Sequence, residues 1–361
     1  YARAKKGIYG FFEMKERING KSLPYCEVVD MGKESRSGHY TLMSQKMLSR
    51  LKDTFDKGEQ AMILLNKRGY ASFIKCETCG EPIKCPHCDV TLTYHKAENR
   101  LKCHLCEYFT SVPQVCPNCG STHLKKIGYG TQKIEEELQK QFPDRRIIRF
   151  DFDTTRNKNT HLKLLKDFEE HKADILLGTQ MIAKGLDFSN VTFVGVLMAD
   201  LSLMVPDFRA SERTFQLLCQ VAGRSGRGAK QGTVMIQTFN PEHYAIKTAV
   251  KQDYEAFFKE EMDFRKKAMY PPYCHLVAII IQSKASKNVH SVACDITKYL
   301  KEHLHKVKII GPQPAFKMQD IYRERILIKY IESKPIYEQL NIINDYYNRT
   351  RKGGVIVACD F

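Results

Sequence analysis

Short apolar runs alternate with stretches of helical periodicity along the first two thirds of this sequence. Apolar residues recur every three or four positions from residue 42 to 54, and a continuous apolar run follows at 61–65. The expected strands are 61–65, 146–150, 174–178, 191–197 and 233–238, and the expected helices are 42–54, 131–142, 162–169 and 211–221. Strands rich in Val, Ile and Leu that alternate with helices predict an α/β fold, with a parallel sheet covered on both faces.

The pattern changes past residue 241. A charged helix is expected over 254–267, and Pro271 and Pro272 end it, because proline lacks the backbone N–H that donates hydrogen bonds in a helix interior. The elements expected beyond are a strand at 275–282, a helix at 288–303, strands at 307–310 and 325–330, a helix at 335–347 and a strand at 354–358. This βαββαβ order predicts a small, separate α+β domain, in which 311–324 forms a loop.

Eight cysteines interrupt the α/β pattern in four turns of identical C-x-x-C spacing. The four turns begin at Cys76, Cys85, Cys103 and Cys116 and end at Cys79, Cys88, Cys106 and Cys119. Two thiolates on such a turn point at one centre about 2.3 Å from each sulfur, and two turns complete a tetrahedral zinc site. Eight ligands therefore predict two zinc ions. A disulfide framework is the competing interpretation, but it is typical of small secreted chains, and the other five cysteines are single and unpatterned.

The spacing leaves open which turns share a zinc ion. The short gap from Cys79 to Cys85 makes it awkward for the first two turns to close on one ion. A nested pairing remains, which joins the outer two turns (Cys76, Cys79, Cys116, Cys119) and the inner two (Cys85, Cys88, Cys103, Cys106). A crossed pairing is the alternative.

Composition and charge narrow the class of protein. With 361 residues, 43% hydrophobic and 27% charged, the chain is long enough for two or three globular domains. A net charge of +16 favours a polyanionic partner such as nucleic acid. No apolar run approaches the ~20 residues of a membrane span, and no signal peptide opens the chain, so we expect a cytoplasmic protein without membrane contact. The chain begins with Tyr1 and not Met, which suggests part of a longer protein.

Two further stretches carry candidate chemistry. The first follows the strand at 174–178 directly and contains Thr179, Gln180, Lys184, Gly185 and Asp187. Polar side chains in this position lie at the carboxyl end of a parallel strand, where open α/β sheets bind their ligands.

The second stretch closes the helix at 211–221 and contains Gln220, Arg224 and Arg227. Because the two arginines are three residues apart at a helix end, both guanidinium groups can face one cleft and bind the phosphates of a nucleotide. Lysine would not provide the same planar fork.

Cations and aromatic residues also suggest nucleic-acid contacts. Lys67 and Arg68 follow the strand at 61–65 and are expected at its carboxyl end. The loop expected at 311–324 includes Lys317, Tyr322 and Arg323, a mixture typical of an edge that binds single-stranded nucleic acid.

The order and spacing of these motifs resemble a known family. The stretches at 178–188 and 220–227 resemble motifs V and VI of the second RecA-like lobe of a superfamily 2 helicase. With the zinc segment inserted, the chain resembles the primosomal protein N′ family of bacterial replication-restart helicases. The matching stretches are Lys67-Arg68-Gly69-Tyr70, Gly128-Tyr-Gly-Thr131, Gly178-Thr-Gln with Lys184-Gly185, Gln220-Val-Ala-Gly-Arg-Ser-Gly-Arg227, and Gly311-Pro312 before Tyr322-Arg323.

This resemblance implies a 3′–5′ ATP-dependent DNA helicase that recognises stalled forks and helps to reload the replicative helicase. The implied partners are forked and single-stranded DNA, single-stranded-DNA-binding protein, primosome proteins and the replicative-helicase loader. The resemblance also supports the nested zinc pairing. The implied roles are γ-phosphate contact for Arg224 and Arg227, nucleotide or coupling contacts for Gln220, Gly185 and Asp187, and DNA contact for Thr179, Gln180 and Lys184.

The implied domains are a connecting segment at 1–40, helicase lobe 2 at 41–75 and 120–240, a zinc insert at 76–119 and a DNA- or partner-binding domain at 241–361. The sequence contains neither a Walker A lysine motif nor a Walker B Asp-Glu pair. ATP and Mg are therefore expected mainly on a first lobe that precedes Tyr1, and this chain alone is expected to be inactive. The alternative is a non-enzymatic zinc-ribbon protein that binds nucleic acid on an α/β scaffold.

Overall fold

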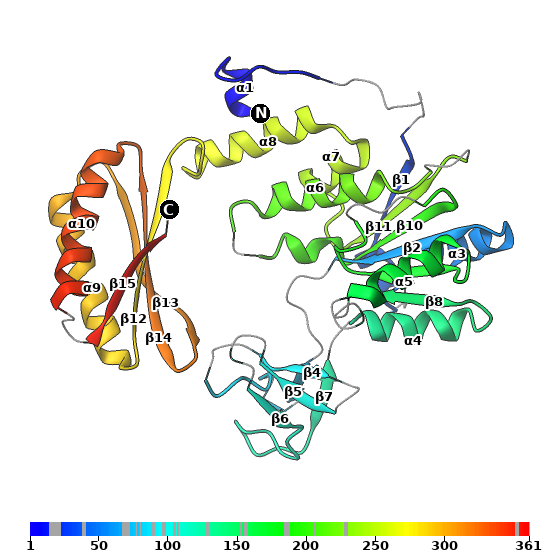
Figure 1. Cartoon of the computed structure of the whole chain (residues 1–361), viewed down its shortest axis with the longest axis horizontal. Helices are drawn as coiled ribbons and strands as arrows, with labels where there is room; N and C mark the ends of the chain where they lie inside the picture. The colour runs from blue at the N-terminus through cyan, green and yellow to red at the C-terminus, as the bar shows by residue number, and fades with distance from the viewer. Residues whose placement is uncertain are drawn as a thin grey trace. The chain divides into compact units, whose positions relative to one another are not determined.

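The computed structural model of the chain describes residues 1–13, 23–37, 41–66, 73–76, 78–79, 81–87, 91–95, 99–103, 106, 108–127, 130–151, 154, 158–183, 188–205, 207–226, 230–350 and 354–360. The chain divides into two compact units. Figure 1 labels their helices and strands. The first unit contains residues 1–70 and 129–263, and the second contains 71–128 and 264–361.

The first unit is built on a six-stranded sheet in which every pairing is parallel. Its strand order is β1-β11-β10-β2-β9-β8. The strands are β1 (Tyr25–Asp30), β2 (Gln60–Leu65), β8 (Ile147–Phe150), β9 (Ile175–Gly178), β10 (Val191–Leu197) and β11 (Thr233–Thr238). The predicted α/β class with a parallel, RecA-like sheet is confirmed.

Both faces of this sheet are covered, because alternate side chains of each central strand point to opposite sides. Ile63 of β2 joins a cluster with α3 and α4, whereas Leu64 joins a cluster with α5, α6, α7 and α8. The helices are α3 (Gln45–Asp56), α4 (Thr131–Gln141), α5 (Lys158–Glu169), α6 (Ala210–Ala222), α7 (Tyr244–Lys251) and α8 (Tyr254–Lys267). Three shorter helical segments are α1 (Ala2–Lys5), α2 (Met31–Arg36) and the 3₁₀ turn η1 (Ala199–Ser202).

β1 is a strand that the sequence does not predict within residues 1–40. It pairs with β11 from Tyr25↔Thr233 to Asp30↔Thr238 and forms one edge of the sheet. An edge strand needs no continuous apolar run, and in β1 only Val29 is fully buried. Because β1 has so little apolar periodicity, its sequence looks like that of a connecting segment. Its pairing with β11 in the structure identifies it as a strand.

The cysteine-rich region of the second unit consists of short antiparallel ribbons. β3 (Phe73–Cys76) pairs with β7 (Leu124–Ile127), and β4 (Thr93–His95), β5 (Arg100–Lys102) and β6 (Phe109–Ser111) form a three-stranded sheet. Ile74, Leu92 and Leu101 are buried in a small core that also includes Cys85 and Cys103. So few apolar side chains offer little stability, which makes metal binding the natural source of additional folding energy.

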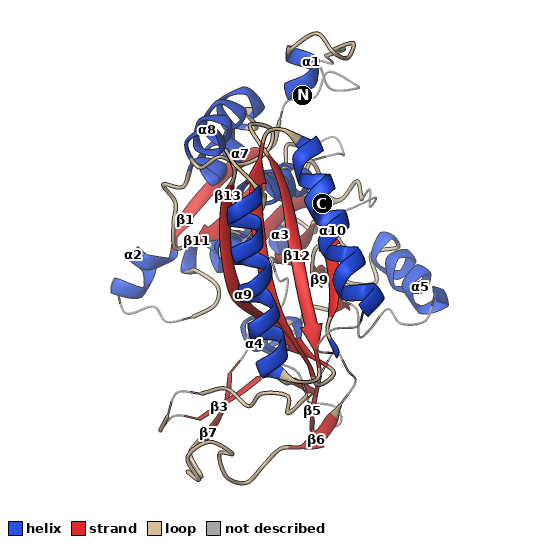
Figure 2. Cartoon of the chain, turned by 90° about the vertical axis from the view of Figure 1, so that its left-hand side faces the viewer, coloured by secondary structure: helices blue, strands red, loops and turns tan. Residues whose placement is uncertain are grey.

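The carboxyl-terminal part of the second unit has the predicted βαββαβ order. It comprises β12 (His275–Ser283), α9 (Ser286–His303), β13 (Lys308–Met318), β14 (Ile321–Tyr330), α10 (Ser333–Thr350) and β15 (Ile356–Asp360). The antiparallel sheet has the order β13-β14-β12-β15, and α9 and α10 cover one of its faces (Figure 2).

The loop predicted at 311–324 is instead the end of a long hairpin. β13 and β14 continue to a two-residue turn at Gln319 and Asp320, whose φ angles are 52° and 59°. The pairing of β13 with β14 is irregular between Ile310 and Gln313, where Pro312 has no N–H to donate to the partner strand. Glycine and prolines in this strand produce the sequence signature of a loop, although pairing with β14 keeps the backbone extended.

Candidate functional site

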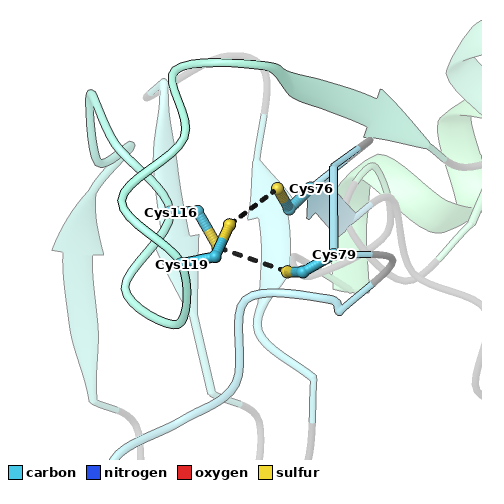
Figure 3. A group of neighbouring side chains, drawn as sticks. All are labelled: Cys76, Cys79, Cys116 and Cys119. Atoms are coloured by element: carbon cyan, nitrogen blue, oxygen red, sulfur yellow. Dashed lines mark hydrogen bonds between the residues drawn. The ribbon is translucent and has the colours of Figure 1, made fainter.

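Two cysteine turns meet beside the β3–β7 ribbon (Figure 3). Cys76 ends β3, and its amide donates to the carbonyl of Glu81 at 2.9 Å. The amide of Cys116 donates in the same way to the carbonyl of Ser121, at 2.8 Å. Gly120 follows the second turn with φ of 73°, a conformation that suits glycine. Each turn therefore folds its chain so that both of its cysteines face one point.

The four sulfurs of this first cysteine group (Cys76, Cys79, Cys116 and Cys119) have the spacing of a tetrahedral metal site. The Sγ atoms of Cys76 and Cys119 are 3.6 Å apart, and those of Cys79 and Cys116 are 3.7 Å apart. All four lie within 4.8 Å of one another. Sulfurs at about 2.3 Å from a central zinc would be about 3.8 Å apart, so the group fits a zinc ion.

The thiols of the first cysteine group differ in acidity. The backbone N–H of Cys79 donates to the sulfur of Cys76 and lowers the pKa of that thiol to about 6. The N–H of Ser121 lowers the pKa of Cys119, but desolvation and the neighbouring sulfur of Cys76 outweigh it and raise this pKa to about 12. One thiol thus ionises readily and another resists. A divalent cation held by these four cysteines would supply the positive charge that lets all four ionise.

A second cysteine group comprises Cys85, Cys103 and Cys106. Their sulfurs also lie within 4.8 Å of one another, with Cys85 and Cys106 at 3.6 Å. The amide of Cys103 donates to the carbonyl of Tyr108 at 2.7 Å, as in the turns of the first group. Cys88, the predicted fourth ligand, lies outside the described residues.

The turn of the β13–β14 hairpin contacts the second cysteine group's loop. The side chain of Asp320 lies 2.6 Å from Nδ1 of His87, and its amide donates to the carbonyl of His87 at 2.9 Å. The ammonium of Lys317 donates to the carbonyl of Pro86 at 2.9 Å, and Met318 packs against the small core of the cysteine region. Lys317, a predicted DNA contact, also helps to hold these two parts of the second unit together.

In the first unit, the turn after β9 is packed tightly. Thr179 and Gln180 come directly after Gly178, where a Cβ atom would lie 2.5 Å from the carbonyl oxygen of Phe150. The side-chain Nε2 of Gln180 donates to Oδ1 of Asn66 at 3.2 Å. Asn66 follows the neighbouring strand β2, so both polar side chains lie at the carboxyl edge of the sheet. Asn66 was not among the predicted site residues, although its position after a buried strand is a usable signal.

Arg224 joins the two predicted motifs. Its Nε donates to the carbonyl of Ala183, in the turn after β9, at 3.0 Å. Gln220 lies one helical turn earlier, exposed on α6. The segment after Arg224 is held by Ser225, whose hydroxyl donates to the carbonyl of Thr192 at 2.9 Å. The sequence identified Arg224 but not Ser225, because a buried serine has no distinctive pattern.

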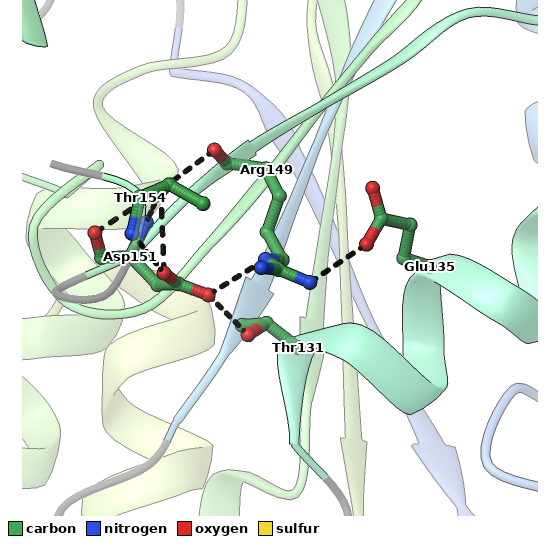
Figure 4. A network of polar contacts seen from close by, with 5 residues as sticks. All are labelled: Thr131, Glu135, Arg149, Asp151 and Thr154. Carbon is green, nitrogen blue, oxygen red and sulfur yellow. Dashed lines mark hydrogen bonds and ion pairs between the residues drawn. The ribbon is translucent and has the colours of Figure 1, made fainter. Parts of the chain in front are cut away.

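A polar network ties the start of α4 to the end of β8 (Figure 4). The hydroxyl of Thr131 donates to Asp151 at 2.5 Å, and Arg149 lies 3.0 Å from the same carboxylate and 2.9 Å from Glu135. Asp151 also accepts the amide of Thr154 at 3.0 Å. Ion pairs and hydrogen bonds join these side chains, so the network positions the carboxyl edge of the sheet.

The other predicted DNA contacts lie on β14. Tyr322 is 40% exposed, and the ammonium of Lys317 lies 5.4 Å from its ring centroid. Arg323 points to the opposite face of the strand, and its buried Nε has no hydrogen-bond partner among the described residues. The remaining predicted site residues lie outside the described residues, namely Lys67, Arg68, Lys184, Gly185, Asp187 and Arg227.

Among the parts of the chain that the structure describes, no helix has both the length and the apolar character needed to cross a bilayer.

Three family models match the chain in separate segments. The PriA DNA helicase Cys-rich region domain matches residues 85–109, the helicase conserved C-terminal domain matches 124–229, and the primosomal protein N C-terminal domain matches 266–360.

Curated relatives match nearly the whole chain. Replication restart protein PriA of Bacillus subtilis (strain 168) is 47% identical over 352 residues, which are 97% of this chain and 44% of that protein. The PriA proteins of Chlamydia pneumoniae and of a Synechocystis strain are 41% and 39% identical, over 94% and 89% of this chain and 46% and 39% of theirs. The chain thus spans less than half the length of these relatives. With its helicase lobe, cysteine-rich region and carboxyl-terminal domain all matched, it belongs to the PriA family of replication restart proteins.

Proposed function

We propose that the complete protein is an ATP-dependent 3′–5′ DNA helicase that recognises stalled forks and initiates replication restart. This chain would supply the second RecA-like lobe, a zinc module and a carboxyl-terminal domain. The observation that carries the proposal is the hydrogen bond from Arg224 to the carbonyl of Ala183. It links the two stretches that a helicase lobe uses to couple nucleotide and DNA, in a chain that belongs to this family.

In this proposal Arg224, with Arg227, binds the γ-phosphate of ATP, since a guanidinium fork matches phosphate oxygens. Gln220, Gly185 and Asp187 would make the nucleotide or coupling contacts. ATP and Mg would be held mainly by residues that this sequence does not contain, because neither Walker motif occurs in it.

We assign two zinc ions to the cysteine region. The first cysteine group would hold one ion, and the second group, completed by Cys88, would hold the other. Sites closed by four thiolates have no open position for a substrate, which assigns the ions a structural role. The described cysteines outside these groups form no disulfide bonds, which fits a reducing compartment. We therefore place the protein in the cytoplasm.

We assign DNA contacts to Thr179, Gln180 and Lys184 in the motor lobe and to Tyr322 and Arg323 on β14. Lys67, Arg68 and Lys317 remain predicted contacts. The net charge of +16 supports a polyanionic partner. We assign partner contacts to the zinc module at 76–119 and the domain at 241–361, with single-stranded-DNA-binding protein, primosome proteins and the replicative-helicase loader as the expected partners.

Replacing Arg224 in the complete protein tests the motor. Arg224→Lys should lower kcat for DNA-stimulated ATP hydrolysis by about 100-fold or more, because an arginine on the transferred phosphate typically contributes about 10³-fold. Affinity for forked DNA should change less than about twofold. Arg213→Lys is the matched control, since Arg213 lies on the same helix in a partly exposed ion pair with Asp207. Unchanged ATP turnover in Arg224→Lys would favour a non-enzymatic nucleic-acid-binding protein.

A further inference from the structure

A thiol, an imidazole and a carboxylate form a chain on the surface of the carboxyl-terminal part of the second unit. Cys294 and His290 lie four residues apart on α9, so their side chains share one face of the helix. Glu324 lies on β14, on the face of the sheet that α9 covers, beside Ile326. These three residues line one shallow pocket, together with Lys287, Ser291 and Asp295.

The distances connect the three groups in series. Nδ1 of His290 is 2.8 Å from Oε1 of Glu324, and Nε2 of the same ring is 3.7 Å from the sulfur of Cys294. When Nδ1–H donates to the carboxylate, Nε2 carries the lone pair and can accept the thiol proton. The imidazole stands between the other two groups, so the three do not converge on one point as metal ligands would.

Glu324 is the buried end of this chain. The residue is only 9% exposed, and its second oxygen, Oε2, has no hydrogen-bond partner among the described residues. A buried carboxylate without full hydrogen bonding is costly unless a positive charge lies beside it. The adjacent His290 can provide that charge once it has taken a proton from the thiol.

Cys294 is more exposed than the other four cysteines outside the two cysteine groups. Burial raises the pKa of Cys26 to about 11 and that of Cys219 to about 12, and it also raises the pKa of Cys274 and Cys359. These four thiols resist ionisation, and the thiolate is the reactive form. Cys294 is exposed and is accessible to a reagent from solvent.

We propose that Cys294, with His290 as its base and Glu324 as the group that positions His290, is a nucleophilic thiol that is modified by low-molecular-weight disulfides. His290 Nε2 takes the thiol proton, and the Cys294 thiolate attacks one sulfur of the disulfide. The sulfur–sulfur bond of the reagent breaks as a new one forms to Cys294. The released thiolate then takes the proton from His290, so the exchange needs no further oxidant.

The first test uses the unsubstituted 361-residue chain with its zinc sites loaded. It is treated at pH 7 with iodoacetamide, which captures thiolates, and labelling of every cysteine is followed over time by peptide mass spectrometry. We expect Cys294 to react about tenfold faster than the same cysteine in an unstructured peptide of residues 286–298, because an unperturbed thiol is only a few per cent ionised at this pH. A rate equal to that of the peptide would overturn the proposal.

Variants test the roles of the two partners. His290→Gln should lower the Cys294 rate about tenfold, and Glu324→Gln should lower it severalfold, because the neutral amide no longer stabilises a protonated imidazole. Lys301→Gln, an exposed position near the end of the same helix and outside the pocket, is the control and should leave the rate unchanged. The labelling of Cys274 and Cys359 reports whether each variant stays folded. Equal Cys294 rates in a folded His290→Gln chain and in the unsubstituted chain would contradict the assignment.

The disulfide itself is tested with oxidised glutathione. We expect a single mixed disulfide, located at Cys294 and removed by a reducing agent, to form before any other cysteine outside the two groups is modified. Preferential modification of another cysteine, or none at Cys294 under conditions that modify the peptide, would overturn the proposal.

Discussion

The turn after α6 shows how single residues hold the motor-lobe site. Gly226 has φ of 69°, and a Cβ atom there would lie 2.2 Å from the amide nitrogen of Gly232. A Cβ on Gly232 would lie 2.2 Å from the hydroxyl oxygen of Ser225. The hydroxyl of Ser225 in turn donates to the carbonyl of Thr192. Two glycines and one serine thus bring the backbone after Arg224 against the start of β10.

Gly226→Ala should therefore lower the free energy of unfolding by about 3 kcal/mol, from left-handed backbone strain and overlap with Gly232. Gly223→Ala, three residues earlier in the same motif, should change it by less than about 1 kcal/mol. Gly223 has φ of −63°, and an added Cβ there meets its nearest atoms at an ordinary 3.5 Å. Urea unfolding of both variants checks the pair, and equal losses would show that this turn is not sterically constrained.

At the scale of elements, the cysteine turns illustrate metal-dependent local structure. Backbone hydrogen bonds close the turns that begin at Cys76, Cys103 and Cys116, but the ribbons behind the turns bury few apolar side chains. The first cysteine group also joins the two ends of its segment, since Cys76 and Cys119 are 43 residues apart. Metal binding and folding of this region should therefore be coupled.

Zinc content provides the direct measurement. The intact chain should release two zinc ions on denaturation, as measured with a chromogenic chelator. Cys116→Ser and Cys103→Ser should each release one, because each removes a ligand from a different group. Cys359→Ser, outside both groups, should still release two. A complete loss of zinc from either single variant would mean that the two sites do not fold independently.

The hairpin contact predicts a second effect of metal removal. The amide of Asp320 donates to the carbonyl of His87, which lies next in sequence to the proposed ligand Cys88. Stripping zinc should loosen the segment that carries His87, so hydrogen exchange at Asp320 should accelerate about tenfold or more. Amides of β12, which lies between β14 and β15 in the sheet, should be unaffected and provide the control. An unchanged exchange rate at the Asp320 amide would show that the hydrogen bond from Asp320 to His87 does not depend on zinc.

At the scale of the whole molecule, this chain contains the residues proposed to bind a nucleotide's γ-phosphate, but its sequence lacks the motifs that usually hold the phosphates and magnesium. No Walker A or Walker B motif occurs in its sequence, and it spans 44% of the length of its Bacillus subtilis relative. A phosphoryl-transfer site needs both kinds of residue in place at once. The lobe described here is therefore one half of the proposed motor.

The purified 361-residue chain should accordingly show no ATP turnover above background, with or without DNA, in a coupled phosphate-release assay. The complete protein provides the positive control. Steady turnover by this chain that Arg224→Lys abolishes would contradict the expectation and would place a complete ATP site within these residues.

Elements with strong local patterns were predictable from the sequence, whereas elements defined by their neighbours were not. The strand at 191–197 was found because its continuous apolar run is the mark of a strand buried on both faces. β1 was missed because an edge strand needs little apolar character, and the extended hairpin was missed because Pro312 and Pro314 resemble loop residues. Arg224 was identified from its motif, but its contact with Ala183 joins residues 41 positions apart.

The sequence by itself determined the kinds of element, the thiolate donor set and the strongly basic character, because periodicity, C-x-x-C spacing and charge are properties of neighbouring residues. Only the tertiary structure decided which cysteines meet, that Lys317 holds the cysteine region, and that Cys294, His290 and Glu324 form a series. Each of these depends on which surfaces pack together. Burial and hydrogen bonding between distant segments set that packing, and no local pattern encodes it.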